Sequence, residues 1–431
     1  MTKQKTDLNP YASSTARYYA LGLLTVVYTF NFIDRQLLAI LQEAIKADLL
    51  LSDAQLGLLT GFAFAVFYVT AGIPIARWAD RSNRRNIIAM AIGLWSFMTA
   101  ISGAVANYTQ LLLARIGVGI GEAGGSPPAH SMISDIFPPE RRAGALSFYS
   151  MGVNIGVLFG FLAGGWLNEI LGWRWAFVVV GVPGVLIALV IWLTLKEPIR
   201  GLADNREPTN EVQPLGSVIA FLWSRRSFRH MAMGAAMNAF AVYSLSSWSA
   251  SFFIRSYDMG TGEVGTWMAG ILGLGGAIGL LLGGLLAERL AVKDVRWYNW
   301  VPGWAAIITV PLIAATFIAE SRALSLLLFV IPGFLMTVYL GNTLAMVHGL
   351  VGLRMRALAS AILLFVLNII GLGMGPFLVG FLSDVLQPSV GVESLRYALL
   401  ALIPAAFAWS SVHFFFSARH LKEDLAQAPT D

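Results

Sequence analysis

The chain has 431 residues, of which 57% are hydrophobic and only 12% are charged. That is about half the charged fraction of ordinary soluble domains. With a mean hydropathy of +0.70 and 43 glycines, the composition predicts an all-α membrane protein with several spans. The absence of cysteine excludes a disulfide scaffold, a thiolate metal site and a cysteine nucleophile. A net charge of +5 would indicate binding of nucleic acid only if the basic residues were clustered on one face of a soluble domain.

Apolar stretches of about 20 residues, long enough to cross a bilayer as a helix, recur along the whole chain. Twelve such stretches are present. Their predicted bounds are 18–41, 55–78, 86–105, 108–130, 143–168, 176–195, 230–254, 264–288, 298–318, 323–348, 357–382 and 395–416. They leave only short connections, with the one long break at 196–229. We therefore expect no soluble catalytic domain and no enzymatic activity.

Lysine and arginine are unevenly divided between the two sets of loops. With a cytoplasmic N-terminus, the outer loops receive only Lys46, Arg174, Arg255, Arg322 and Arg396. The positive-inside rule thus predicts that both termini are cytoplasmic, and it explains the basic charge without a nucleic-acid partner. Residues 1–16 are polar and lack an apolar run, so no signal peptide is expected.

Two groups of small and charged residues recur in the second half of the chain. The offset is 215 residues between spans 5 and 11 and 208 residues between spans 2 and 8. The pairs are Gly156, Gly160, Gly165 and Glu169 with Gly371, Gly375, Gly380 and Asp384, and Ala76, Ala79, Asp80 and Arg81 with Gly284, Ala287, Glu288 and Arg289. Such near-equal offsets predict a duplicated six-helix unit.

The predicted organisation is therefore an N-terminal six-helix half at 1–195, a cytoplasmic linker at 196–229, and a C-terminal half with a short tail at 230–431. The end of the linker, 218–226, mixes apolar residues with arginines. Two readings stay open for it: a short helix on the membrane surface or a polar linker running into span 7.

Span 5 carries glycine at every fourth position, at Gly152, Gly156, Gly160 and Gly164. Small residues with this spacing let two helix backbones touch. We expect this glycine ladder to pack against a helix of the other half, namely span 8.

The loop between spans 2 and 3 reads Ala76-Arg77-Trp78-Ala79-Asp80-Arg81-Ser82-Asn83-Arg84-Arg85. It resembles the signature loop of the major facilitator superfamily, G-x-x-x-D-R-x-G-R-R, with alanine and asparagine in place of its glycines. Asp80 can accept hydrogen bonds from a helix N-terminus, and Arg81, Arg84 and Arg85 can meet Asp135 and Glu140 past span 4. We expect a cytoplasmic gate. Purely topogenic charges would explain the arginines but not Asp80.

Ionisable residues inside spans are functional by default because they are costly to bury in a membrane. Span 1 contains Asp34 and Arg35, and span 4 contains Arg115 and Glu122. Counting about 1.5 Å per residue from the outer ends places Asp34 and Arg115 at similar depth and Glu122 about 10 Å deeper. We expect Asp34 to associate with Arg115 or Arg35, leaving Glu122 more weakly paired near a central cavity. Such carboxylates suit proton coupling, and a static ion network is the alternative.

Asn31 to Arg35, Arg115 to Ala123 and Asp80 to Arg85 together resemble the Spinster family of this superfamily. The resemblance implies proton-driven transport of sphingosine-1-phosphate or lysophospholipids, carried here by Asp34, Arg35, Arg115 and Glu122. The segment Gly124-Gly125-Ser126-Pro127-Pro128 departs from the more polar or aromatic sequence expected in animal relatives. Substrate identity therefore does not transfer.

The leading hypothesis is a proton-coupled transporter of an amphipathic, lipid-like substrate, acting as a monomer in a bacterial inner membrane. The alternative is a small organic anion transporter or a multidrug exporter. A scaffold without transport does not require a buried titratable cluster. We expect substrate, protons and membrane lipids as partners, and no cofactor, metal or nucleic acid. Single polar residues either line the cavity or join helices: Asn31, Asn238, Tyr243, Ser247, Trp248, Tyr339, Asn342 and Asn368.

Overall fold

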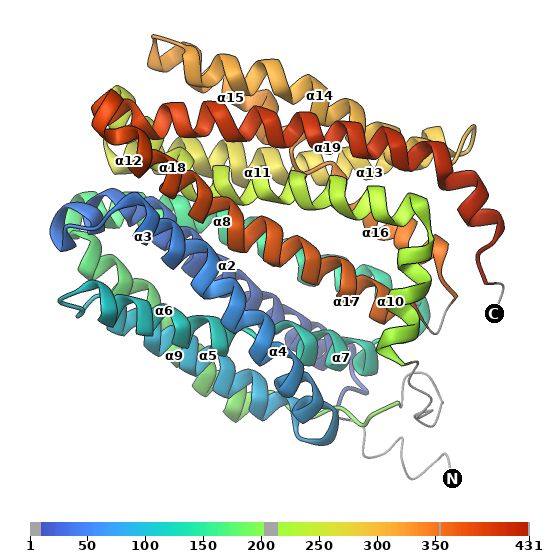
Figure 1. The fold of residues 1–431 in the computed structure, drawn as a ribbon. Coiled ribbons are helices and arrows are strands. Elements are labelled where there is room, and N and C mark those ends of the chain that lie inside the picture. Colours follow the sequence, from blue (N-terminus) through green and yellow to red (C-terminus); the bar gives the residue numbers. More distant parts are fainter. Residues whose placement is uncertain (1–9, 202–213, 353–354, 430–431) are drawn as a thin grey trace. The chain divides into compact units, whose positions relative to one another are not determined.

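A computed structural model describes residues 10–201, 214–352 and 355–429, and these are helical with no strand (Figure 1). The spans of the N-terminal half begin with one long helix and include two interrupted ones. They are α2 (Ser14–Leu49); α3 (Asp53–Gly57), η1 (Leu58–Phe62) and α4 (Ala63–Arg81); α5 (Arg84–Ser102); α6 (Tyr108–Glu122) and α7 (Ser126–Ile136); α8 (Pro139–Leu171); and α9 (Trp173–Thr194).

The C-terminal half repeats this plan after a short linker helix, α10 (Leu215–Ser224). Its spans are α11 (Arg226–Tyr257); α12 (Thr261–Met268), η3 (Ala269–Gly275) and α13 (Gly276–Ala291); α14 (Trp297–Ile318); α15 (Arg322–Leu335) and α16 (Tyr339–Leu350); α17 (Arg356–Val366), η5 (Leu367–Met374) and α18 (Gly375–Val390); and, after the short turn η6 (Gly391–Glu393), α19 (Ser394–Ala426). The twelve predicted spans in two six-helix halves are confirmed.

By length and composition alone, nine stretches of the described residues qualify as membrane spans. One of them, Leu358–Ala426, contains both span 11 and span 12. Span 7 is absent because α11 is rich in serine and basic residues. Span 4 is absent because Arg115, Glu122 and the glycines and prolines that follow them lower its mean hydropathy. The polar spans are therefore the ones that apolarity alone misses.

The duplication is also visible in where the helices depart from α geometry. Span 4 is interrupted after Glu122 and span 10 after Leu335, 213 residues later. Wider π-helical turns begin at Leu58 in span 2 and at Ala269 in span 8, 211 residues apart. These offsets match those of the sequence repeat. π turns and breaks of this kind are frequent at functional sites.

The described residues pack as two compact units. The first contains residues 10–49 and 66–201, and the second contains residues 50–65 and 214–429. This grouping differs from the repeat only in the first part of span 2. That segment packs on spans 7 and 11: a Cβ at Gly61 would lie 2.8 Å from the carbonyl oxygen of Leu372, so only glycine permits the approach.

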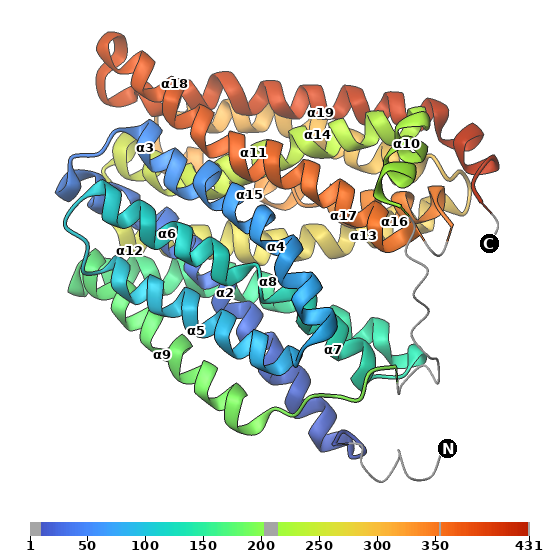
Figure 2. The same cartoon turned by 60° about the horizontal axis from the view of Figure 1, so that its bottom comes forward.

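The glycine ladder of α8 packs within the first unit, against α2. A Cβ at Gly156 would lie 2.5 Å from Cβ of Phe32, and one at Gly160 would lie 2.9 Å from the carbonyl oxygen of Ile33. The expectation of span 8 as its partner was wrong. The ladder reports that backbones touch, but not which helix supplies the second backbone. A comparable contact joins α5 to α9, which run side by side in Figure 2.

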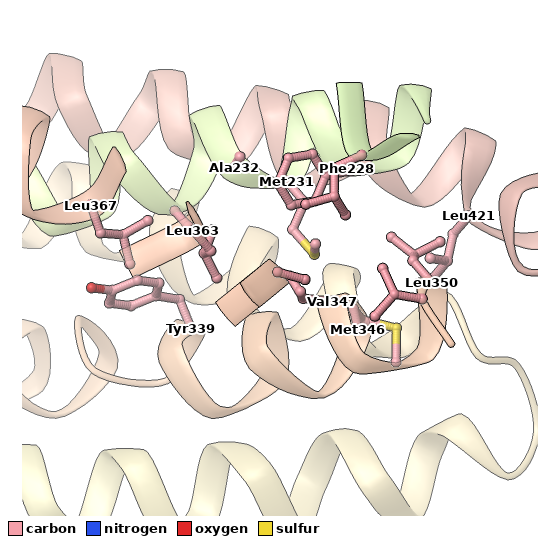
Figure 3. Packing of buried hydrophobic residues seen from close by; sticks show 14 of the residues in the cluster. Phe228, Met231, Ala232, Tyr339, Met346, Val347, Leu350, Leu363, Leu367 and Leu421 are labelled. Carbon is pink, nitrogen blue, oxygen red and sulfur yellow. The ribbon is translucent and has the colours of Figure 1, made fainter. Parts of the chain in front are cut away.

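The linker helix α10 belongs to the second unit. Val218 and Leu222 are buried in a cluster formed by α10, α11, α16, α17 and α19, part of which Figure 3 shows around Phe228 and Leu350. Residues 215–224 form a short helix, as one of the two readings of the linker has it, and its position on the membrane surface stays a prediction. The linker residues 202–213 lie outside the described residues.

Candidate functional site

Asp34 and Arg115 meet inside the first unit, joining α2 to α6. Nη1 of Arg115 lies 3.3 Å from Oδ2 of Asp34, and each residue is 2% exposed. The other carboxylate oxygen, Oδ1, accepts a 2.6 Å hydrogen bond from Thr99 of α5. Of the two partners expected for Asp34, Arg115 is the one that binds it, at the similar depth counted from the sequence. Thr99 was missed because a single threonine in a span carries no distinctive signal.

Glu122, the last residue of α6, is paired with Arg35 of α2. Arg35 donates to Oε2 of Glu122 from both Nε, at 2.8 Å, and Nη2, at 2.7 Å. The expectation that Glu122 is weakly paired was wrong. The guanidinium stands at the end of a long flexible side chain, so Arg35 reaches a depth that counting backbone positions does not give it. Oε1 of Glu122 is buried without a hydrogen-bond partner among the described residues.

The two ion pairs form one electrically balanced site of two carboxylates and two guanidinium groups. The side chain of Glu122 is fully buried, whereas that of Arg35 is 15% exposed, so the site is reached from the Arg35 side. The guanidinium of Arg35 also lies over two aromatic rings, 5.0 Å from the centroid of Phe32 and 5.2 Å from that of Tyr68. Arg35 is therefore held by a carboxylate and by ring faces at once.

The chain ends α6 at this site for a local reason. Ala123, Gly124 and Gly125 follow Glu122, and prolines occupy the first turn of α7, where a missing N–H is tolerated. Tight turns replace the helical bonds: Gly124 donates to the carbonyl of Gly121 and Gly125 to that of Glu122, each at 3.0 Å. The carboxylate thus sits directly beside a break in its helix.

A second charged cluster surrounds Arg84 at the start of α5. The buried guanidinium of Arg84 binds Asp135 of α7 at 2.5 Å and Glu197 at 2.7 Å. It also donates to Ser131 at 2.7 Å and to the carbonyl of Pro198 at 3.2 Å. The predicted meeting of a loop arginine with Asp135 is confirmed for Arg84. Glu197 was missed because it lies in the predicted linker rather than in a span.

The remaining loop residues are placed differently. Arg85 donates from its side chain to Asn86 and from its backbone N–H to Glu197. Asp80, Arg81 and Glu140 are exposed, and within the described residues none of them makes an ion pair or a side-chain hydrogen bond. The role of this group as a cytoplasmic gate stays a prediction.

Most of the predicted cavity residues lie in the second unit. Asn31 is buried in α2. Asn238, Trp248, Tyr339 and Asn342 are buried, whereas Tyr243 and Asn368 are half-buried. Trp248 donates from Nε1 to the carbonyl of Pro376 at 2.9 Å, and Asn342 donates to the carbonyl of Val338 at 3.1 Å. Oδ1 of Asn238 has no partner among the described residues.

The second unit holds its own buried ion pair, which the sequence did not indicate. Arg255 of α11 donates from both Nη atoms to Asp53 of α3, each at 2.7 Å, and Asp53 is 2% exposed. Ser383 donates to the same carboxylate at 2.6 Å. Asp384 accepts from the backbone N–H groups of Asp53 and Ala54 at 2.9 and 2.8 Å. Asp384 therefore caps the N-terminus of span 2.

Comparison with known proteins gives a consistent result. Residues 24–376 match the Major Facilitator Superfamily. An "MFS-type efflux pump" of Mycolicibacterium smegmatis is 35% identical over 95% of this chain and 94% of its own length. The "Sphingosine-1-phosphate transporter SPNS2" of Danio rerio is 25% identical over 95% of this chain and 85% of its own length.

Among solved structures, a bacterial homologue of the human lysosomal transporter Spinster, crystallised inward-facing and occupied, superimposes with a TM-score of 0.85. It is 33% identical, and the match covers 96% of this chain and 99% of that one. The fold, the buried charges of α2 and α6, and these matches agree. The chain belongs to the Major Facilitator Superfamily of transporters and, within it, to the Spinster family.

Proposed function

We propose that the chain is a proton-coupled secondary active transporter that works by alternating access and carries an amphipathic, lipid-like substrate. The observation that carries this proposal is the buried set of Asp34, Arg115, Arg35 and Glu122 between α2 and α6. Replacing buried ion pairs by apolar residues often leaves stability unchanged or higher. Their presence in a membrane span therefore favours a role in transport over a purely structural one.

The chemistry follows from the two pairings. A proton on Glu122 neutralises the carboxylate that binds Arg35, and the guanidinium then becomes available to an anionic headgroup. Loss of that proton restores the pair. The protonation state of Glu122 thus decides which anion Arg35 binds. Asp34 keeps its ion pair with Arg115 and its hydrogen bond from Thr99 whether or not Glu122 carries a proton. We therefore assign Asp34 to holding α2, α5 and α6 in position around the site.

The lipid-like character of the substrate is supported by the predicted cavity residues of the second unit and by the family. The candidate residues of spans 7, 10 and 11 are aromatic rings and amides, and no ionisable residue comparable to Glu122 stands among them. Arg35 suits an anionic headgroup, and side chains of this kind suit an apolar tail. The name of the relative SPNS2 records a substrate of this chemistry.

The alternative is export of drugs or small organic anions, and the relative named an efflux pump favours it. A thermal-shift screen of sphingosine-1-phosphate, lysophosphatidylglycerol, a sugar acid and a cationic dye separates the two. Stabilisation by the first pair alone supports the lipid-like class. Stabilisation by the acid or the dye alone contradicts it.

Coupling is tested in proteoliposomes with an imposed pH gradient. Asp34→Asn and Glu122→Gln should each abolish gradient-driven transport, whereas Glu140→Gln, at an exposed acid, should leave it intact. Transport by Glu122→Gln at the parental rate and with the parental pH dependence would overturn the coupling role.

We further propose that both termini face the cytoplasm of a bacterial inner membrane, because the basic residues gather in one set of loops. The cysteine-free chain makes this testable with single cysteines. Leu50 and Val292 are equally exposed, at 88% each, and lie in loops of opposite sides. In intact cells, an impermeant maleimide should label Leu50→Cys and not Val292→Cys. The reverse pattern would invert the topology.

A further inference from the structure

The second unit has a groove of about 660 Å³ between α13, α14 and α15, within the usual range of small-molecule sites. Its lining is aliphatic and aromatic, with Arg289 as the one charged side chain among the lining residues. Several lining residues stay half exposed, including Leu286 at 51%, Trp304 at 52% and Ile308 at 49%. The protein's own side chains therefore do not fill this space.

The groove is shaped by glycines that draw α13 onto its neighbours. A Cβ at Gly283 would lie 2.7 Å from Cγ1 of Val338, and one at Gly276 would lie 3.3 Å from Cγ2 of Thr337. Leu282 and Leu286 of α13 line the groove and stay 48% and 51% exposed. Close packing of α13 against the turn between α15 and α16 thus forms one wall of the groove.

Among the described residues, no carboxylate forms an ion pair with Arg289. The neighbouring carboxylate of Asp294 is occupied by Arg296 at 2.7 Å and by Lys422 at 2.9 Å. Glu288 precedes Arg289 directly, and adjacent residues on a helix do not face each other. Arg289 is exposed and makes no ion pair or side-chain hydrogen bond within the described part of the chain. An anion is the missing partner.

The dimensions match one leaflet of a bilayer. Arg289 and Trp297 lie at the same end of the groove, on either side of the loop between α13 and α14. The lining reaches Ile308, eleven residues along α14 from Trp297, which is about 16 Å at 1.5 Å per residue. Half of a hydrocarbon core measures about 15 Å. Arginine and tryptophan at the wet end suit the headgroup region.

We infer that this groove binds one anionic phospholipid of the bordering leaflet, with the phosphate at Arg289 and an acyl chain along α13 and α14. Under the topology proposed above, that leaflet is the cytoplasmic one. The bound lipid is a constituent of the membrane rather than the cargo, because the groove lies wholly within spans 8 to 10 and includes none of the predicted cavity residues.

The test is native mass spectrometry of the purified full chain, titrated with phosphatidylglycerol and with phosphatidylcholine of identical chains. The parent should bind one copy of phosphatidylglycerol about tenfold more tightly than phosphatidylcholine, as expected for one charge-assisted contact. Arg289→Gln should remove that preference. Lys293→Gln removes the same charge four residues away, outside the groove, and should keep it.

A second pair of variants tests the acyl chain. Ile308→Trp adds bulk inside the groove and should weaken both lipids, whereas Ile307→Trp, at a similarly exposed neighbour outside the lining, should not. Equal loss in Arg289→Gln and Lys293→Gln, or equal affinity of the parent for the two lipids, would overturn the inference. Lipid binding is measured without transport, so the result is independent of the proposed cargo, and cysteine labelling tests the leaflet separately.

Discussion

Arg35 grips Glu122 with two nitrogen donors, Nε at 2.8 Å and Nη2 at 2.7 Å, and so joins the middle of α2 to the last residue of α6. Arg35 is directly preceded by Asp34, whose carboxylate binds Arg115 seven residues before Glu122. Two adjacent residues of α2 therefore pair with two residues of α6 that lie two helical turns apart. Release of one pair leaves the other to hold the helices together.

Glu122→Gln should make the conformational equilibrium insensitive to pH, because the amide keeps the size of the side chain but does not titrate. Pairs of spin labels on cysteines introduced at the two ends of the bundle report the distance distributions between pH 5 and pH 8. The parent should shift with pH and the variant should not. A shift of parental size in the variant would remove Glu122 from the mechanism.

Thr99→Val should lower stability by about 1.5 to 3 kcal/mol, the usual worth of a hydrogen bond to a charged group, because it removes the 2.6 Å bond to Asp34. Thr309→Val is the matched control. Thr309 is fully buried and donates only to the carbonyl of Ala305, in its own helix. Thermal unfolding in detergent should separate the two variants, and equal losses would show that Asp34 gains nothing from Thr99.

Gly156→Ala should destabilise the protein by about 1 to 3 kcal/mol through overpacking, since its Cβ would lie 2.5 Å from Phe32 and 2.6 Å from the carbonyl oxygen of Thr29. On the same helix, Gly144 has nothing within 4 Å of its Cβ position. Gly144→Ala should be neutral or stabilising by up to about 1 kcal/mol. Unfolding curves of the two variants that coincide would contradict the contact between α8 and α2.

Arg255→Gln should cost about 3 to 5 kcal/mol, because it leaves the buried carboxylate of Asp53 without its cation. Arg174 pairs with Asp48 at the surface, where both side chains are more than 40% exposed. Arg174→Gln should therefore cost less than about 1 kcal/mol. A larger loss of unfolding free energy in Arg174→Gln than in Arg255→Gln would contradict this prediction.

Asp294 should contribute to acid stability. Hydrogen bonds from Arg296 hold the pKa of its carboxyl below the usual 3.8. A carboxyl with a lowered pKa in the folded state stabilises the protein above pH 4, and that contribution disappears as the pH falls further. Asp294→Asn should thus reduce thermal stability at pH 5 to 7 and have progressively less effect below pH 4. A difference that grows towards low pH would contradict the assignment.

Much of the fold was predictable because the lipid bilayer requires that each span be a helix of about 20 residues. The same regularity placed Asp34 opposite Arg115, since depth follows from counting residues along two helices. The break after Glu122 was not predicted, since span 4 was expected to run unbroken over 108–130, although glycines and prolines follow Glu122. The twelve spans, their pairing into halves and half of the ion-pair network therefore follow from sequence.

The predictions that failed concern which residues or helices contact each other, rather than where each residue lies along its span. The glycine ladder of α8 requires a close neighbour, but any of several helices satisfies it. Arg35 reaches Glu122 through side-chain length, which residue counting ignores. Glu197 and Asp53 lie outside the central parts of the spans, where an acidic residue is unremarkable, and only the packed structure brings them to Arg84 and Arg255.

The short helix α7 links the two charged clusters of the first unit. It is a rod of eleven residues, about 16 Å long, that follows the break after Glu122 at one end and is tied through Asp135 to Arg84 at the other. A short helix of this kind can rotate about one end as a rigid body. We therefore expect a change of charge at Glu122 to displace α7 and, through Asp135, the loop that begins α5.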